Sequence, residues 1–205
     1  MQRAQPPAGR TGPVLGPLPG LPRAWGVTEQ EWATALPCDE GTGPGWVRLM
    51  RGVSCSAPPE AVWPWLCMMR RAPYSYDWVD NLGRRSPRTL DPAMADLAPG
   101  QVVATVFVLE SFVQGESFTM TLRPGRATAA FGQIRSTYAV WPAPSATGGG
   151  SRIVGVMHCA PRPSLPRRAA GVLLDWGDLV MMRKQLRTFA ELAERDSQQV
   201  PRPSS

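Results

Sequence analysis

The chain has 205 residues, of which 43% are hydrophobic and 19% charged, as is typical of one globular domain with a sizeable core. Its 23 prolines and 20 glycines exclude regular structure throughout, so part of the chain should be loop. The net charge of +6 comes from scattered arginines without a recognised nucleic-acid-binding module, which argues against nucleic acid as a partner.

Cysteine and histidine usage gives no sign of a metal or another cofactor. The four cysteines, Cys38, Cys55, Cys67 and Cys159, lack C-x-x-C spacing, and there is one histidine. We expect reduced, mostly buried thiols. No stretch approaches eighteen apolar residues and the N-terminus has no signal-peptide core, which predicts a cytoplasmic protein without stable membrane insertion.

The N-terminal residues predict an arm followed by a domain. Residues 1–24 are rich in Pro and Gly and should be disordered, so deleting residues 1–23 should leave the melting temperature nearly unchanged. The domain should span residues 25–196, with a disordered tail at 197–205. Near its start, Thr28 and Glu31 have the spacing of a helix capping box.

The stretch from Ala57 to Gly83, APPEAVWPWLCMMRRAPYSYDWVDNLG, concentrates aromatic residues on two predicted short helices. The first begins at the Pro58-Pro59 pair, and Pro64 should kink it or end it early. Its apolar face contains Val62, Trp63, Trp65, Leu66 and Met69. The second carries Tyr74, Tyr76, Trp78 and Leu82. Such aromatic density on short helices favours the mouth of a cavity.

Alternating patterns predict an antiparallel meander after residues 46–56, which also read as a strand. Residues 101–110 are apolar on both alternating faces, which indicates a strand covered on both sides. Residues 117–121 alternate, with Phe118, Met120 and Leu122 on one face. A turn at 123–126 and strands at about 127–132, 134–141 and 152–160 should follow.

A final helix is predicted from about Leu165 to Arg195. Its apolar stripe contains Leu165, Ala169, Val172, Trp176, Leu179, Leu186, Phe189, Ala190 and Ala193. Arg183 interrupts this stripe. Gly171 and Gly177 would let the helix bend or let another group approach closely.

Two of these segments resemble a known family. VWPWL followed by YSYDW-x-x-N, together with VMMRKQLRTFAELAER, resembles actinobacterial members of the START-related SRPBCC (polyketide cyclase/dehydrase) superfamily. The resemblance implies an α+β helix-grip fold, in which a curved antiparallel sheet wraps a long C-terminal helix and two short helices follow the first strand.

The resemblance also implies a hydrophobic small-molecule ligand, polyketide-like or lipid-like, in a cavity between sheet and helix. Three function classes stay open: a polyketide cyclase, aromatase or dehydratase, a non-catalytic carrier or sensor, and a partner-binding domain with a filled pocket. The oligomeric state is also open, and no residue is identified as catalytic.

The candidate ligand-binding residues are Tyr74, Tyr76, Trp78, Phe107, Trp141, His158, Trp176, Leu179 and Arg183. Tyr74, Tyr76 and Asp77 either transfer protons on a polyketone or tie their helix to the sheet. His158 is expected to be packed or hydrogen-bonded. Arg183 either reaches solvent or points into the cavity, where it would hold an enolate, carboxylate or phenolate. Asp175 and Asp178 are expected at the surface, as capping groups or partners of nearby arginines.

Overall fold

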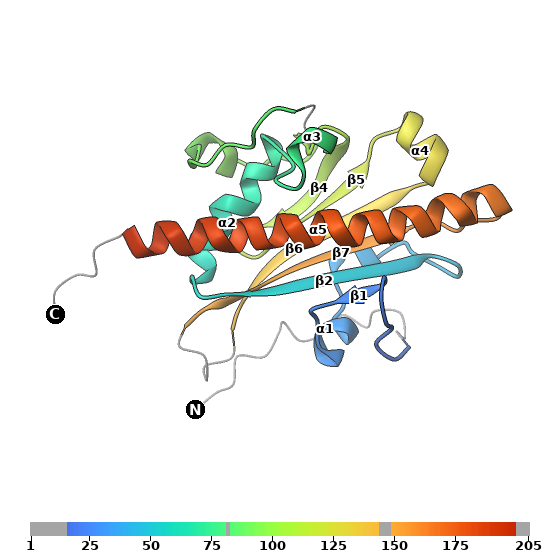
Figure 1. Cartoon of the computed structure of the whole chain (residues 1–205), viewed down its shortest axis with the longest axis horizontal. Helices are drawn as coiled ribbons and strands as arrows, with labels where there is room; N and C mark the ends of the chain where they lie inside the picture. Colours follow the sequence, from blue (N-terminus) through green and yellow to red (C-terminus); the bar gives the residue numbers. More distant parts are fainter. Residues whose placement is uncertain (1–15, 81–82, 144–148, 200–205) are drawn as a thin grey trace.

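A seven-stranded sheet forms the centre of the protein, and one long helix lies across it (Figure 1). The computed structural model describes residues 16–80, 83–143 and 149–199. The strands are β1 (Ala24–Trp25), β2 (Val47–Cys55), β3 (Val102–Val103), β4 (Phe107–Val113), β5 (Ser117–Leu122), β6 (Ile134–Pro142) and β7 (Ser151–Cys159). The helices are α1 (Glu29–Ala33), α2 (Pro59–Cys67), α3 (Asp77–Asp80), α4 (Arg126–Phe131) and α5 (Leu165–Gln199). Three 3-10 turns are η1 (Pro37–Asp39), η2 (Met68–Arg70) and η3 (Pro92–Ala95).

The strands lie in the order β1-β2-β7-β6-β5-β4-β3. All pairings are antiparallel except that of β1 with β2, so the sheet is mixed rather than wholly antiparallel. On β7, Gly155 lies opposite Arg51 of β2 on one side and Tyr138 of β6 on the other. Directly opposed residues of an antiparallel pair share one face of the sheet. Arg51, Gly155 and Tyr138 therefore form a row across the sheet.

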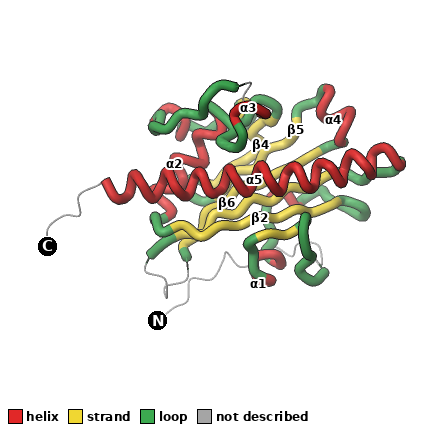
Figure 2. Tube along the Cα trace, in the orientation of Figure 1, coloured by secondary structure: helices red, strands yellow, loops and turns green. Residues whose placement is uncertain are grey.

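Both faces of the sheet are covered, as the alternation along β6 shows. Tyr138 and Val140 belong to the core cluster that includes residues of α2 and α5. Ala139 and Trp141 pack on the opposite side, against the segment that contains Trp32. Helix α5 runs lengthwise over the first face (Figure 2). This is the predicted helix-grip architecture.

The two short helices expected before the meander are present as α2 and α3. The predicted apolar face of α2 is buried. Pro64 does not end this helix early, because α2 continues to Cys67 and is followed directly by η2. Helix α3 begins later than expected, at Asp77, so that Tyr74 and Tyr76 precede it. Leu82 lies outside the described residues.

The expected strand at 127–132 is instead helix α4. Its sequence RATAAF is rich in alanine, the residue with the highest helix propensity, and this outweighs the pattern that suggested a strand. Gly132 ends the helix with a φ of 80°, a conformation that glycine adopts readily.

The expected strand at 101–110 is divided into β3 and β4. Ala104 and Thr105 have φ angles of 43° and 62°, and this turn interrupts the extended chain. Val102 and Val106 are exposed, so the expectation that both faces are covered was wrong. β3 is an edge strand, and Val102 on it is 44% exposed.

Residues 16–24, expected as part of the arm, contact the domain. Leu18 packs against the cluster around Trp32, whose indole N–H donates to the Gly16 carbonyl at 3.1 Å. The Met50 N–H donates to the Arg23 carbonyl at 2.8 Å. At the other end, α5 continues past the expected end at Arg195 to Gln199. Residues 1–15 and 200–205 lie outside the described residues.

Candidate functional site

A buried arginine lies between the sheet and α5. Arg51 alternates with Leu49 and Val53 along β2, which places its side chain on the face that α5 covers, where it is 0% exposed. One terminal nitrogen lies 3.0 Å from a carboxylate oxygen of Asp178 on α5. The other donates to the Arg23 carbonyl at 2.7 Å. Arg51 thus joins the sheet, the N-terminal segment and α5.

A second ion pair supports the same part of α5. Arg162 donates two hydrogen bonds to the Asp175 carboxylate, at 2.6 and 3.0 Å. Gly171 makes this geometry possible, because a Cβ at that position would lie 2.2 Å from the Arg162 Nε. Asp175 and Asp178 are therefore arginine partners, as predicted, but they face inward rather than lying at the surface.

Tyr138 and Gln185 form a buried hydrogen bond near the ion pair of Arg51 and Asp178. The Tyr138 hydroxyl and the Gln185 amide oxygen are 2.5 Å apart. The Gln185 amide nitrogen donates to the Pro73 carbonyl, which precedes Tyr74. Together Arg51, Tyr138, Asp178 and Gln185 form what we call the interior polar set. It links the sheet through α5 to the segment at Tyr74.

Burial changes the proton affinity of this set. It raises the pKa of Asp178 to about 6, although the positive charge of Arg51 acts in the opposite direction. Burial also raises the pKa of the Tyr138 hydroxyl, so that it stays protonated. The set therefore contains a hydroxyl, an amide, a guanidinium and a carboxyl group that exchanges its proton below neutrality.

The rest of this interior is apolar and filled by side chains. Tyr138 stacks on Phe118 with ring centroids 5.6 Å apart, and Tyr74 packs on Phe189 at 5.2 Å. A hollow beside α2, lined by residues such as Leu66 and Phe118, has no room for a water molecule. Where we expected an open cavity, side chains of the sheet and α5 are in contact. An open groove of about 560 Å³ lies instead beside the second half of α5, and its lining includes Trp25, Val53 and Ala190.

Three donors in the interior have no hydrogen-bond partner among the described residues. They are the Tyr74 hydroxyl, the Trp63 indole N–H and the Arg51 Nε. An unsatisfied buried polar group costs about 1–3 kcal/mol of stability and calls for an explanation. Tyr74 also has a φ of 59°, which a residue other than glycine seldom adopts.

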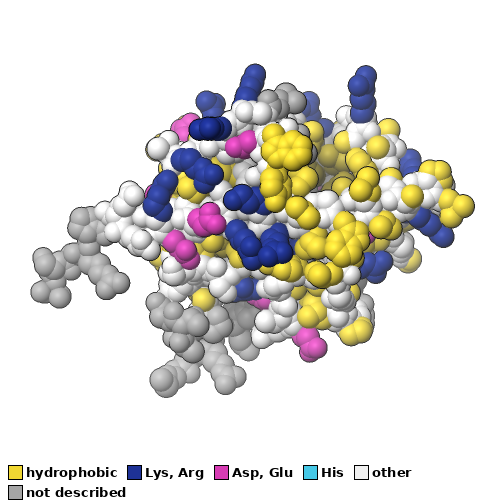
Figure 3. All heavy atoms as spheres, viewed as in Figure 1, with side chains coloured by type: hydrophobic (Ala, Val, Ile, Leu, Met, Phe, Trp, Pro, Cys, Tyr) yellow, Lys and Arg dark blue, Asp and Glu magenta, His cyan; other side chains and the backbone are white. Residues whose placement is uncertain are grey.

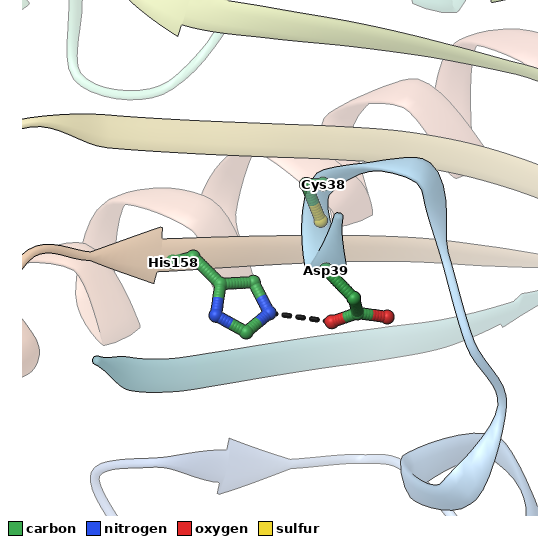
Figure 4. Close-up of side chains that lie close together, drawn as sticks. All are labelled: Cys38, Asp39 and His158. Carbon is green, nitrogen blue, oxygen red and sulfur yellow. Dashed lines mark hydrogen bonds and ion pairs between the residues drawn. The ribbon is translucent and has the colours of Figure 1, made fainter. Parts of the chain in front are cut away.

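A second buried polar cluster lies on the other face of the sheet (Figure 4). The His158 Nε2 and the Asp39 Oδ1 are 2.5 Å apart, and the Arg48 Nε is 3.2 Å from the same oxygen. Burial alone would raise the pKa of Asp39, but His158 and Arg48 lower it overall. His158 is thus hydrogen-bonded, as predicted, and its acidic partner is Asp39.

Cys38, Asp39 and His158 could offer one ligand atom each to a metal ion, since these atoms lie within 4.8 Å of one another. Their surroundings do not fit one. Arg48 already supplies the positive charge beside Asp39. Burial, with help from Asp39, raises the pKa of the Cys38 thiol to about 12, which disfavours the thiolate that a metal requires. The cluster instead holds η1 against the sheet.

The structure does not bring the predicted site residues together. Tyr74 and Leu179 are buried on the α5 side, and Phe107 packs partly buried at the same interior. Trp141 and His158 lie on the opposite face, because strand alternation points them away from α5. Tyr76 is half-buried.

Three further candidates point outward. Trp78 is 78% exposed and Trp176 is 48% exposed. Arg183 reaches solvent and lies over the Trp25 ring, 4.9 Å from its centroid, so it does not enter the interior. The arginine of the interior is Arg51, which the sequence analysis missed. The signal was available, since Arg51 interrupts the apolar alternation of β2 as Arg183 interrupts the stripe of α5.

No family model matches the sequence, and no curated protein matches it. Solved structures with a similar fold include the aromatase/cyclase Zhui from Streptomyces sp. R1128, with a TM-score of 0.49, 13% identity, and coverage of 74% of this chain and 96% of that one. Ara h 8.0201 gives a TM-score of 0.45 and 10% identity, covering 76% and 100% of the two chains. A Staphylococcus aureus protein of unknown function gives 0.48 and 15%, covering 75% and 97%. The likeness is one of fold.

Proposed function

We propose that the protein binds a hydrophobic small molecule between the sheet and α5, with its polar groups directed to Tyr74 and the interior polar set. The observation that carries this proposal is Tyr74. Its side chain is 1% exposed, its hydroxyl has no partner among the described residues, and its backbone is strained. A ligand oxygen at this hydroxyl would offset the cost of burying it.

The composition of the interior supports the same proposal. Ligand sites are mostly apolar with a few placed polar groups, and this interior has that make-up. Its walls include the buried methionines Met68, Met69, Met120 and Met182. Methionine is flexible and repacks readily, so such walls can separate around a ligand. A bound molecule would displace side chains that now touch across the interior.

Binding without catalysis is favoured over a cyclase or dehydratase activity. Tyr138 is already engaged with Gln185, and burial disfavours its deprotonation. Asp178, the group that exchanges a proton most easily here, faces Arg51. A carrier or sensor of a polyketide-like or lipid-like molecule needs only the apolar walls and the hydrogen-bonding groups.

The test is Tyr74→Phe, with Tyr76→Phe as the matched control on the same segment. Aromatic polyketones, fatty acids and sterols would be titrated and followed by tryptophan fluorescence. Tyr74→Phe should leave stability equal or higher, because it removes an unpartnered buried hydroxyl. It should weaken binding about fivefold, the effect of losing one hydrogen bond, while Tyr76→Phe binds normally.

Two results would contradict the proposal. Equal affinity of wild type and Tyr74→Phe would remove this hydroxyl from the site. No binding of any class by the wild type would leave the filled interior as a structural core and favour the alternative, a domain that binds a protein partner.

A further inference from the structure

The first half of α5 presents hydrophobic side chains to solvent. Those exposed are Leu165, Val172, Leu173, Trp176 and Val180, and we call them the outer face of α5. Leu173 is 74% exposed. In Figure 3, hydrophobic side chains gather over this half of α5 and over α4 beside it. Contiguous apolar surface of this kind marks an interaction site more often than single exposed residues do.

The outer face is exposed because α5 uses another side to contact the sheet. In this half of the helix the buried residues are Gly171, Asp175, Leu179 and Met182. Asp175 and Asp178 are held inward by Arg162 and Arg51. These ion pairs fix the rotation of the helix about its axis and leave the predicted apolar stripe outside at Leu165, Val172 and Trp176.

The charges around the outer face are of one sign. Arg167 and Arg168 are exposed in the first turn of α5, beside this face, and Arg126 is exposed on α4 with Arg123 just before it. Helix α4 touches α5 through the Arg167 guanidinium and the Ala129 carbonyl. The acidic residues in this half of α5 are Asp175 and Asp178, and both are paired inward. The surface is therefore apolar and basic.

The combination of apolar and basic side chains limits which partner can bind the outer face of α5. A second copy of the chain on the same surface would bring arginines against arginines, which disfavours a symmetric dimer. The occupant must be apolar and negatively charged. A helix with Trp and aliphatic residues flanked by arginines fits the boundary between the acyl chains and the headgroups of an anionic membrane.

We infer that the outer face of α5 docks the protein on an anionic membrane surface. Trp176, Leu173 and their neighbours enter the headgroup boundary, and Arg167 and Arg168 bind lipid phosphates. No helix among the described residues is long and apolar enough to cross a bilayer. The contact is one of surface binding.

The experiment is co-sedimentation of the full chain with vesicles of phosphatidylcholine alone or mixed equally with phosphatidylglycerol. Wild type should bind the mixed vesicles and not the neutral ones, and added salt should release it. Leu173→Ser with Trp176→Ser should lower the affinity by more than about tenfold, because the loss of apolar contact adds over two residues. Arg167→Glu with Arg168→Glu should lower it at least as much.

The control is Arg23→Glu with Arg71→Glu, two exposed arginines outside the outer face. It changes net charge as much as the Arg167 and Arg168 pair and should keep wild-type binding. If both pairs of charge reversals weaken binding equally, the net charge of the protein explains its binding to anionic vesicles. That result would overturn the proposed docking surface. Absence of binding to mixed vesicles overturns it too, as does a dimer in solution that Trp176→Ser dissociates.

Discussion

At the scale of single residues, buried charges of the two faces respond to pH with opposite signs. Asp39 has a lowered pKa, so its contribution to stability is present at neutral pH and is lost as pH falls below its ordinary value of 3.8. Asp178 has a pKa raised to about 6, so the folded protein holds its proton more tightly than the unfolded chain does. Ionising Asp178 therefore costs stability.

Asp178→Asn should reveal this cost in the pH dependence of unfolding by urea. The penalty starts near pH 4 and is complete above about pH 6, and this span of pKa corresponds to about 3 kcal/mol. Between pH 4 and pH 6, the free energy of unfolding of the variant should therefore rise relative to that of the wild type by about 3 kcal/mol. Any constant offset from the weakened Arg51 contact cancels in this comparison. A difference between the two proteins that does not change with pH would contradict the assignment.

At the scale of elements, the short helix α1 is fixed both locally and through the sheet. The predicted capping box is confirmed: Glu31 N–H donates to the Thr28 hydroxyl at 3.1 Å, and Thr28 N–H donates to the Glu31 carboxylate at 2.8 Å. The same carboxylate accepts from Arg152 of β7 at 2.7 and 3.0 Å. Glu31 therefore caps α1 and also binds this helix to the sheet through Arg152.

We predict that Thr28→Ala lowers the free energy of unfolding by about 1 kcal/mol, the usual effect of losing a cap. Glu31→Ala should cost more, because it also leaves Arg152 without its carboxylate. Thr28→Ser, which keeps the hydroxyl, serves as the control and should be close to wild type. Equal losses for Thr28→Ala and Glu31→Ala in urea titrations would show that the Arg152 tie adds nothing.

At the scale of the whole molecule, the N-terminal segment packs along the edge of the sheet beside β2 and on its second face. The Arg23 carbonyl accepts from the Met50 N–H and the Arg51 guanidinium, and Leu18 adds to the cluster around Trp32. Because of these contacts, we no longer expect the deletion of residues 1–23 to leave the melting temperature nearly unchanged. Deleting residues 1–23 removes these hydrogen bonds and should lower the free energy of unfolding by about 1–2 kcal/mol. The melting temperature should fall by several degrees as a result.

Deleting only residues 1–15 is the matched comparison for thermal unfolding, because it keeps every contact named above. If both truncated chains melt together with the full-length protein, the packing of residues 16–23 contributes no stability.

The sequence alone determined those features that depend on local pattern. The capping box, the buried face of α2, the apolar side of β5 and the start of α5 each follow from spacing within one element, and each is confirmed. The end of α5 was placed four residues too early. The helix-grip fold followed from the family resemblance. Helix α4 differs from the predicted strand because its alanines have a high helix propensity, which outweighs a weak strand pattern.

Only the tertiary structure decided which side of α5 faces inward and which distant residues meet. The apolar stripe of α5 predicted a cavity wall formed by Trp176, Leu179 and Arg183. Leu179 is buried, but Trp176 and Arg183 face solvent, since ion pairs with Arg51 and Arg162 draw Asp178 and Asp175 toward the sheet. His158 and Asp39 likewise meet across 119 positions of sequence. Hydrophobic spacing favours the rotation that buries the most apolar area, whereas buried charges require partners, and a partner on a distant strand cannot be found from spacing.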